Sequence, residues 1–212
     1  MANNEDTVES NPKDGHKSDC MHVKYHKVNN NWYLVVCHMA VCLIFNSNCT
    51  RRLFTFDINK PAQKVHKAGL SQAESAALND VWFTCSSKAY DFDTSEEFIA
   101  VGTNEGRIFK VKESVPGQFT KEVGFTMGII NPIVTMASDA KSRHLLVGSG
   151  GGEVTFLKCS LENQWDMINQ EISPNAYNNN PVTCSDVLGL GLNMFVVGFA
   201  SGSIRLYLCE TG

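Results

Sequence analysis

The pattern V-G-x-x-x-G-x-[IV] occurs three times in this chain and constrains its fold more than any other feature. The copies start at residues 101, 147 and 197, so their first glycines are 46 and 50 residues apart. Self-similarity at a fixed period of roughly 20–50 residues indicates one supersecondary unit used repeatedly. Each copy predicts a β-hairpin, because an apolar strand leads into a turn that needs the φ freedom of glycine and an alternating strand follows. The structural turn glycines are Gly102, Gly106, Gly148, Gly152, Gly198 and Gly202.

A second anchor precedes two of the copies at a nearly constant distance. Asn131-Pro132-Ile133 matches Asn180-Pro181-Val182, and each proline lies 16 or 17 residues before its V-G glycine. Proline is tolerated at the first residue of a strand because no hydrogen bond inside the ladder is lost. Two anchors in register indicate true repeats. We therefore expect strand pairs that turn at 103–105, 149–151 and 199–201.

The chain divides into a polar tail and one all-β domain. Residues 1–20 are too polar to bury a core and predict a disordered tail, and residues 21–212 form the domain. Its sheets are expected at about 21–58, 81–125, 132–172 and 181–208, as three four-stranded units and one of three strands. The innermost strand of the second unit is 81–84 or 88–92, of which the turn signal that follows favours the latter. A capping box at Ser71 and Glu74 predicts a short helix over 72–78.

The repeated unit resembles the WD-repeat family, most closely in Phe98–Ile108 and then in Gly202–Tyr207. The resemblance implies a β-propeller, with one four-stranded blade every ~40–45 residues around a central channel. It also implies that the propeller continues beyond residue 212, so that about three and three-quarter blades form an incomplete, truncated propeller; closure with four blades is the alternative. The family's Trp-Asp dipeptide is replaced at Val111-Lys112, Leu157-Lys158 and Tyr207-Leu208, which puts the family's internal hydrogen-bond network in doubt.

Composition narrows the class of partner. The net charge of −4 provides no basic field for a phosphate backbone, so nucleic acid is not expected as a partner. The longest apolar stretch, 32–45, is interrupted by His38 and is shorter than the ~18 residues that indicate a membrane span, and none is expected. The polar N-terminus lacks a secretory signal, and the eight cysteines include no C-x-x-C pair. Reduced thiols and a cytoplasmic location are the resulting expectations.

Catalytic, cofactor and metal chemistry are not expected. The glycine run 148–152 leads into a strand, whereas a phosphate-binding loop opens a helix, so the run predicts a turn. Cys20, His22 and His26 could ligate zinc, but on a strand the two histidines lie far apart, and surface histidines are the preferred interpretation. No G-x-S-x-G elbow occurs, and Asp91 and Asp93 are interpreted as a strand end and a turn. An enzyme is therefore disfavoured.

Two functions fit this architecture. The first is a non-enzymatic scaffold that binds protein or peptide partners on a face of the propeller. The alternative is a structural subunit of a larger assembly, ciliary or vesicle-associated, whose open sheet edge is completed by a partner chain; self-association through this edge is also possible. Residues at and around the expected turns are preferentially interpreted as ordinary turn residues. The alternative, a partner-binding surface, rests on Phe199 as an exposed aromatic contact. The candidate partner-binding residues are Thr103, Asn104, Glu105, Asn131, Ser149, Asn180, Phe199, Ala200 and Ser201.

Overall fold

The computed structural model describes residues 20–58, 81–92, 94–126, 131–139, 141, 143–160, 164–172, 180–188 and 194–208. The regular elements within these ranges are fifteen strands. They are β1 (Cys20–Val28), β2 (Asn31–His38), β3 (Val41–Asn46), β4 (Arg52–Asp57), β5 (Phe83–Asp91), β6 (Glu96–Thr103), β7 (Arg107–Val115), β8 (Gln118–Thr126), β9 (Ile133–Ser138), β10 (Leu145–Ser149), β11 (Glu153–Ser160), β12 (Gln164–Ile172), β13 (Val182–Val187), β14 (Met194–Phe199) and β15 (Ile204–Leu208).

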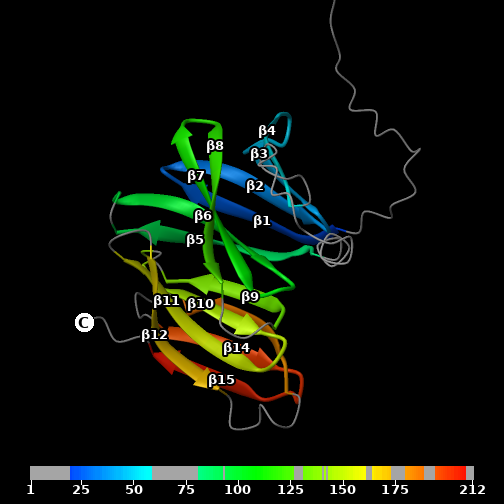
Figure 1. Cartoon of the computed structure of the whole chain (residues 1–212), viewed down its shortest axis with the longest axis vertical. Helices are drawn as coiled ribbons and strands as arrows, with labels where there is room; N and C mark the ends of the chain where they lie inside the picture. Colours follow the sequence, from blue (N-terminus) through cyan, green and yellow to red (C-terminus); the bar gives the residue numbers. More distant parts are fainter. Residues whose placement is uncertain are drawn as a thin grey trace, which may run out of the picture.

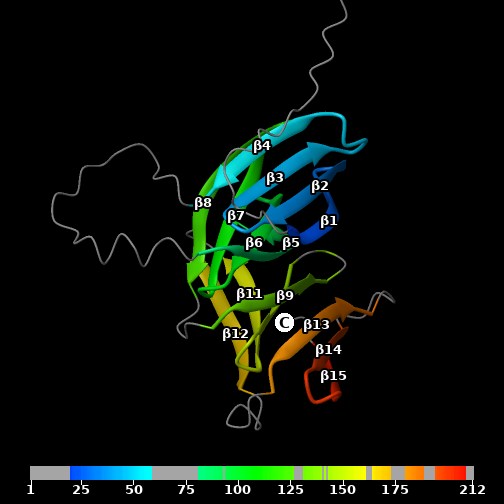
Figure 2. The ribbon, with the colours of Figure 1, turned by 90° about the vertical axis from the view of Figure 1, so that its right-hand side faces the viewer.

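Consecutive strands pair antiparallel into four sheets, here called blades 1 to 4. Blade 1 is β1–β4, blade 2 is β5–β8, blade 3 is β9–β12 and blade 4 is β13–β15. A single parallel pair, Asp91 with Cys159, joins blades 2 and 3. The blades follow one another from the blue and cyan sheet to the red strand β15 (Figures 1 and 2).

The predicted all-β fold and its fifteen strands are confirmed. Two details differ from the sequence-based boundaries. Strand β1 begins at Cys20, which had been assigned to the tail. Strand β5 includes the second half of one proposed inner strand of blade 2, 81–84, and all but the last residue of the other, 88–92. The predicted helix over 72–78 and tail residues 1–19 lie outside the described residues.

The hydrophobic core lies between consecutive blades. Strand β2 illustrates the cause, because Tyr33, Val35 and Cys37 alternate with more exposed residues and present one buried face to blade 2. Across that interface, the ring of Phe56 lies 5.0 Å from Phe83 in an edge-to-face contact. Similar apolar clusters lie between blades 2 and 3 and between blades 3 and 4. Packing between blades therefore holds the series together.

The glycine in each of the first two V-G pairs allows the next blade to approach closely. A Cβ on Gly102 would lie 2.9 Å from Ile133 Cγ2, and one on Gly148 would lie 2.6 Å from Val182 Cγ1. Ile133 and Val182 follow the two prolines of the second sequence anchor. The V-G glycine of one blade thus leaves the space that the residue after the proline of the next blade fills, which explains why both motifs recur together.

The second glycine of each copy ends a tight turn between the second and third strands. Gly106, Gly152 and Gly202 have φ angles of 75°, 90° and 81°, a region that other L-residues rarely adopt. In each copy the amide two residues after the first glycine donates to a carbonyl at or just before the start of the inner strand. These hydrogen bonds are Asn104 N to Trp82 O (3.0 Å), Gly150 N to Pro132 O (2.8 Å) and Ala200 N to Pro181 O (2.9 Å). We call residues 103–106, 149–152 and 199–202 the corner turns.

One buried histidine links blades 1 and 2. The imidazole Nε2 of His26 on β1 lies 2.9 Å from the hydroxyl of Ser86 on β5. Burial, aided by the charges of nearby Lys24, His22 and Lys88, lowers the pKa of His26 from 6.5 to about 3. His26 is therefore neutral in the folded protein at neutral and mildly acidic pH.

This histidine is expected to make stability fall on acidification. Below pH 6.5 His26 is protonated in the unfolded chain, whereas in the folded chain it stays neutral down to about pH 3. The free energy of unfolding therefore decreases as the pH falls between these two values. The free energy of unfolding changes by up to about 1.4 kcal/mol per pH unit in this range. The total loss between pH 7.5 and pH 5 is about 2 kcal/mol. Burial and Lys24 also lower the pKa of His22, which acts in the same direction. Urea unfolding at pH 7.5 and pH 5 measures this change. The free energy of unfolding of His26→Gln should depend less on pH than that of the unmodified chain; an equal pH dependence would show that His26 is not the group responsible.

Candidate interaction surface

The structure places the predicted partner-binding residues at the end of the blades that carries the corner turns. Most of their side chains make hydrogen bonds within the fold. Asn104 Oδ1 accepts from the amide of Trp82 at 2.8 Å, and Asn180 Oδ1 accepts from the amide of Ser201 at 2.9 Å. Thr103 Oγ1 accepts from the amide of Arg107 at 3.1 Å. These side chains hold the corner turns in place.

Residues from blades 3 and 4 do come together at this end. The hydroxyl of Ser149 donates to Glu153 at 3.0 Å, and the amide of Asn131 donates to the same carboxylate at 3.4 Å. A Cβ on Gly152 would lie 2.6 Å from the carbonyl oxygen of Asn180, so the corner turn of blade 3 rests on the entry to blade 4. Ala200 and Ser201 are exposed, whereas Thr103, Ser149 and Asn180 are buried.

The expectation that Phe199 is an exposed contact is wrong. Its side chain is only 3% exposed and lies in the cluster between blades 3 and 4, with Arg205 Cζ 5.2 Å from its ring centroid. Phe195, Val197 and Phe199 alternate along β14, so all three face blade 3. This alternation is visible in the sequence and is the signal that would have indicated a buried Phe199.

A different aromatic residue lies among cations at the opposite end of the blades, where β5, β7 and β11 end. Phe92 follows β5 and is half-buried, with the ring of Tyr90 edge-on at 5.2 Å. From blade 3, Lys158 Nζ lies 4.9 Å and Arg143 Cζ 5.7 Å from the Phe92 centroid. Among the side chains that the structure describes, which do not include that of Asp166 opposite Lys158 on β12, neither cation pairs with a carboxylate. We call Phe92, Arg143 and Lys158 the Phe92 cluster.

A buried ion pair fixes the strand that leads into this cluster. Asp91 is fully buried, and its carboxylate contacts the ammonium groups of Lys110 and, at 2.9 Å, Lys112 on β7. Burial alone would lower the pKa of Lys112, but its contact with Asp91 outweighs burial and the pKa is raised. Asp91 is thus the strand end that the sequence predicted, and its carboxylate has a structural partner that the sequence did not reveal.

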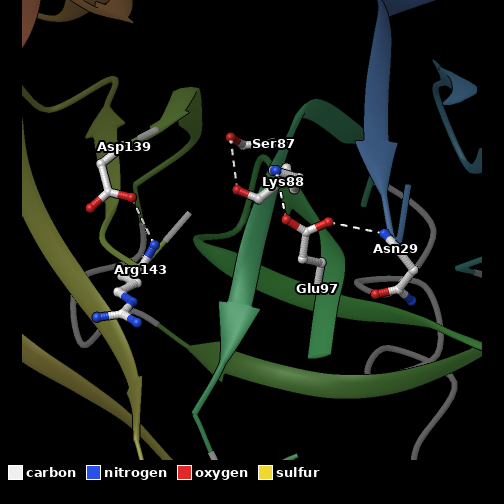
Figure 3. Close-up of polar contacts among 6 residues, drawn as sticks. All are labelled: Asn29, Ser87, Lys88, Glu97, Asp139 and Arg143. Carbon is white, nitrogen blue, oxygen red and sulfur yellow. Dashed lines mark hydrogen bonds and ion pairs between the residues drawn. The ribbon is translucent and has the colours of Figure 1, made fainter. Parts of the chain in front are cut away.

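Further polar contacts position the loops at this end (Figure 3). Glu97 accepts from the backbone amide of Asn29 at 2.9 Å and pairs with Lys88 at 2.8 Å, which ties the first turn of blade 1 to blade 2. In blade 3, Asp139 Oδ1 accepts from the backbone amide of Arg143 at 2.8 Å (Figure 3). The backbone amide of Arg143, whose side chain belongs to the Phe92 cluster, is therefore held by Asp139.

The described residues were searched for a metal site and for a helix that could span a membrane. No group of three or more His, Cys, Asp or Glu side chains suited to a metal ion occurs in the part of the chain that is described. Of the three residues considered for zinc, Cys20 is exposed and His26 bonds to Ser86. The described residues also include no helix long and apolar enough to span a bilayer.

Solved structures with this arrangement of blades identify the architecture. Sqt1 from Saccharomyces cerevisiae matches 92% of this chain with a TM-score of 0.61 and 15% identity. The β-propeller domain of Cps50 (Swd1) from Myceliophteria thermophila matches 92% with a TM-score of 0.57 and 8% identity. The fold is a partial β-propeller. The match spans 47% and 55% of those two chains, so this chain is about half their length.

Both matched structures are WD40 propellers, which agrees with the resemblance inferred from the sequence. Identities of 15% and 8% establish the fold alone. The amino-acid sequence matches no protein-family model and no curated protein. In propeller terms, the corner turns and the Phe92 cluster occupy opposite faces of the disc, because antiparallel strands carry the chain from one face to the other.

Proposed function

We propose that this chain is a non-enzymatic scaffold that binds a protein or peptide segment carrying carboxylates, and that the Phe92 cluster is the contact site. A scaffold role in general agrees with the WD40 propellers that the chain resembles in fold. Within the family, Phe98–Lys112 and Phe195–Tyr207 resemble WD-repeat-containing protein 54, and this narrower relationship belongs to the proposal. A cytoplasmic location is proposed with it.

One observation carries the proposal. Arg143 and Lys158 flank the half-buried ring of Phe92. Aromatic residues and arginine are both enriched at protein interfaces relative to the rest of the surface. Two such cations also favour an acidic partner over a basic one, since like charges at an interface are strongly disfavoured.

Peptide selection on the purified chain tests the proposal with a defined probe. A phage-displayed library of random peptides should yield ligands rich in Asp and Glu with at least one apolar residue. Arg143→Glu should weaken their binding by about tenfold or more, and Lys158→Gln by a smaller factor, with a steep dependence on salt concentration.

Arg51→Glu is the matched control for this test. Arg51 is also exposed, lies in the β3–β4 turn of blade 1, and makes the same change of charge when replaced. It should leave peptide binding unchanged. Selected peptides that are not acidic, or that bind Arg143→Glu as well as the original chain, would place the contact site elsewhere.

A structural subunit is the second candidate function. The observation that favours it is the row of exposed apolar residues on β15, the last strand described. In this alternative a partner chain completes the open edge within a larger assembly, of which a ciliary or vesicle-associated complex is the proposed type.

A further inference from the structure

The turn that joins β5 to β6 carries two exposed hydroxyl residues beside the Phe92 cluster. Phe92 is its first residue, and Thr94 and Ser95 are both exposed. The backbone amide of Thr94 donates to Asp91 Oδ1 at 3.4 Å, so the turn folds back over the end of β5. Ser95 has a φ of 56°, a left-handed conformation that is common in tight turns.

This turn lies where blade 2 meets blade 3. Asp91 forms the parallel pair with Cys159, which follows Lys158 on β11. Two residues of extended chain span at most about 7 Å, so the backbone of Thr94 lies within about 7 Å of that of Phe92. The Debye length at physiological ionic strength is about 8 Å. A charge at the end of the Thr94 side chain is therefore close enough to act on the cations of the Phe92 cluster.

The charges around the turn favour an additional anion there. At the end of β5, the ammonium groups of Lys110 and Lys112 both contact the carboxylate of Asp91. Of the two glutamates that follow the turn, Glu97 pairs with a lysine at 2.8 Å (Figure 3), whereas Glu96 is exposed. Repulsion from one water-exposed carboxylate is weaker than attraction to the two cations of the Phe92 cluster.

The residues after Thr94 match the substrates of an acidophilic protein kinase. Ser95, Glu96 and Glu97 follow it, so carboxylates lie two and three residues beyond the threonine hydroxyl. A kinase with a basic substrate groove is complementary to such a segment, because opposite charges steer the encounter. Exposed turns open locally at a lower free energy than core strands do, which gives a kinase access to the segment.

We propose that Thr94 is a phosphorylation site, and that its phosphate pairs with Arg143 and Lys158 and blocks the Phe92 cluster. This regulation rests on the proposed function, because it acts on the same site. A phosphate adds a charge of about −1.5 to −2 at pH 7 and three acceptor oxygens that bond well to arginine. It thus occupies the cations that an acidic peptide needs.

The modification requires ATP and a Ser/Thr protein kinase. Thr94 Oγ1 forms a bond to the γ-phosphorus of ATP while the bond from that phosphorus to the bridging oxygen breaks. ADP leaves with the electron pair of the broken bond, and the proton of the hydroxyl is released. A phosphatase restores the unblocked site by hydrolysing the phosphate ester with water.

Mass spectrometry tests the modification after the full chain is incubated with ATP, Mg²⁺ and an acidophilic Ser/Thr kinase. Phosphate is expected on Thr94, on Thr94→Ser at the same position, and equally on a Ser95→Ala chain. Absence of phosphate from residue 94 of the folded chain, or its loss in Ser95→Ala, would overturn the assignment of Thr94.

Phosphorus NMR shows whether the phosphate reaches the cluster, independently of any peptide. Thr94→phosphothreonine provides the sample, and Thr55→phosphothreonine is the matched control, since Thr55 is also exposed but lies on β4 of blade 1. Cations favour the dianion, so the second pKa of the phosphate should be lower at residue 94 than at residue 55. Arg143→Gln should raise it. Equal pKa values at the two sites would mean that the phosphate does not pair with the cluster, contrary to the proposal.

Binding of a selected acidic peptide tests the block itself. Thr94→phosphothreonine should weaken binding about fivefold or more, whereas Thr55→phosphothreonine should leave it unchanged. Equal binding by the chain phosphorylated at residue 94 and the unmodified chain would overturn the proposed block and leave the acidic-peptide site standing. An unmodified chain that binds no acidic peptide would instead overturn the proposed function, and this regulation with it.

Discussion

Replacing Gly152 with alanine is expected to lower the free energy of unfolding by about 2–4 kcal/mol. Two causes add: an L-residue at a φ of 90° is strained, and the new Cβ would lie 2.6 Å from the carbonyl oxygen of Asn180. The first costs roughly 1 kcal/mol and the second about 1–3, because backbone at the blade 3–blade 4 interface must shift. Urea unfolding followed by circular dichroism measures the change.

Gly202 supplies the matched control, since it occupies the equivalent position in blade 4. Its φ is 81°, but no atom lies within 4 Å of the position that a Cβ would take. Gly202→Ala should therefore cost only the backbone strain, about 1 kcal/mol. Equal losses at both sites would show that the corner turn of blade 3 does not rest on blade 4.

Replacing Asp91 with asparagine is expected to cost about 3–5 kcal/mol, because it removes the buried carboxylate that contacts the ammonium groups of Lys110 and Lys112. Adding Lys110→Met should recover part of that loss, since the double variant no longer buries this charge. The stability of both variants can be measured by urea unfolding at neutral pH.

The partly exposed pair of Glu105 and Arg107, at 3.1 Å, provides the comparison for Asp91. Glu105→Gln should change stability by less than about 1 kcal/mol, as expected for an ion pair in contact with water. A loss at Asp91 as small as that at Glu105 would mean that water reaches the Asp91 carboxylate.

The sequence predicted the parts of the fold that depend on local backbone requirements. At Gly102 and Gly148 the V-G position must admit the next blade, and in all three copies the turn glycine must adopt positive φ. The prolines at 132 and 181 marked the inner strands for a related reason, since the residue after each packs on, or close to, a V-G glycine. These constraints act between residues that are near in sequence or separated by a nearly constant number of residues. They therefore appear in the sequence as a motif that recurs once per blade.

The candidate site depends on contacts between residues far apart in the sequence, which produce no recurring motif. Phe92 meets Arg143 and Lys158 from another blade, 51 and 66 residues further along the chain. Phe199 was misplaced because it was interpreted as a turn residue, although it continues the buried alternation of β14. Side-chain burial at a strand end depends on whether another blade covers it.

The central structural claim is that the three V-G-x-x-x-G copies are equivalent corners of successive blades. Hydrogen exchange resolved by NMR at the amides of Asn104, Gly150 and Ala200 tests it most directly, because each donates to the entry of its own inner strand. The account predicts that all three amides are protected and exchange with similar free energies of opening, in a spectrum dominated by β-sheet shifts. Exchange of these amides at the rates of an unstructured peptide, or helical shifts across 98–112, would contradict it.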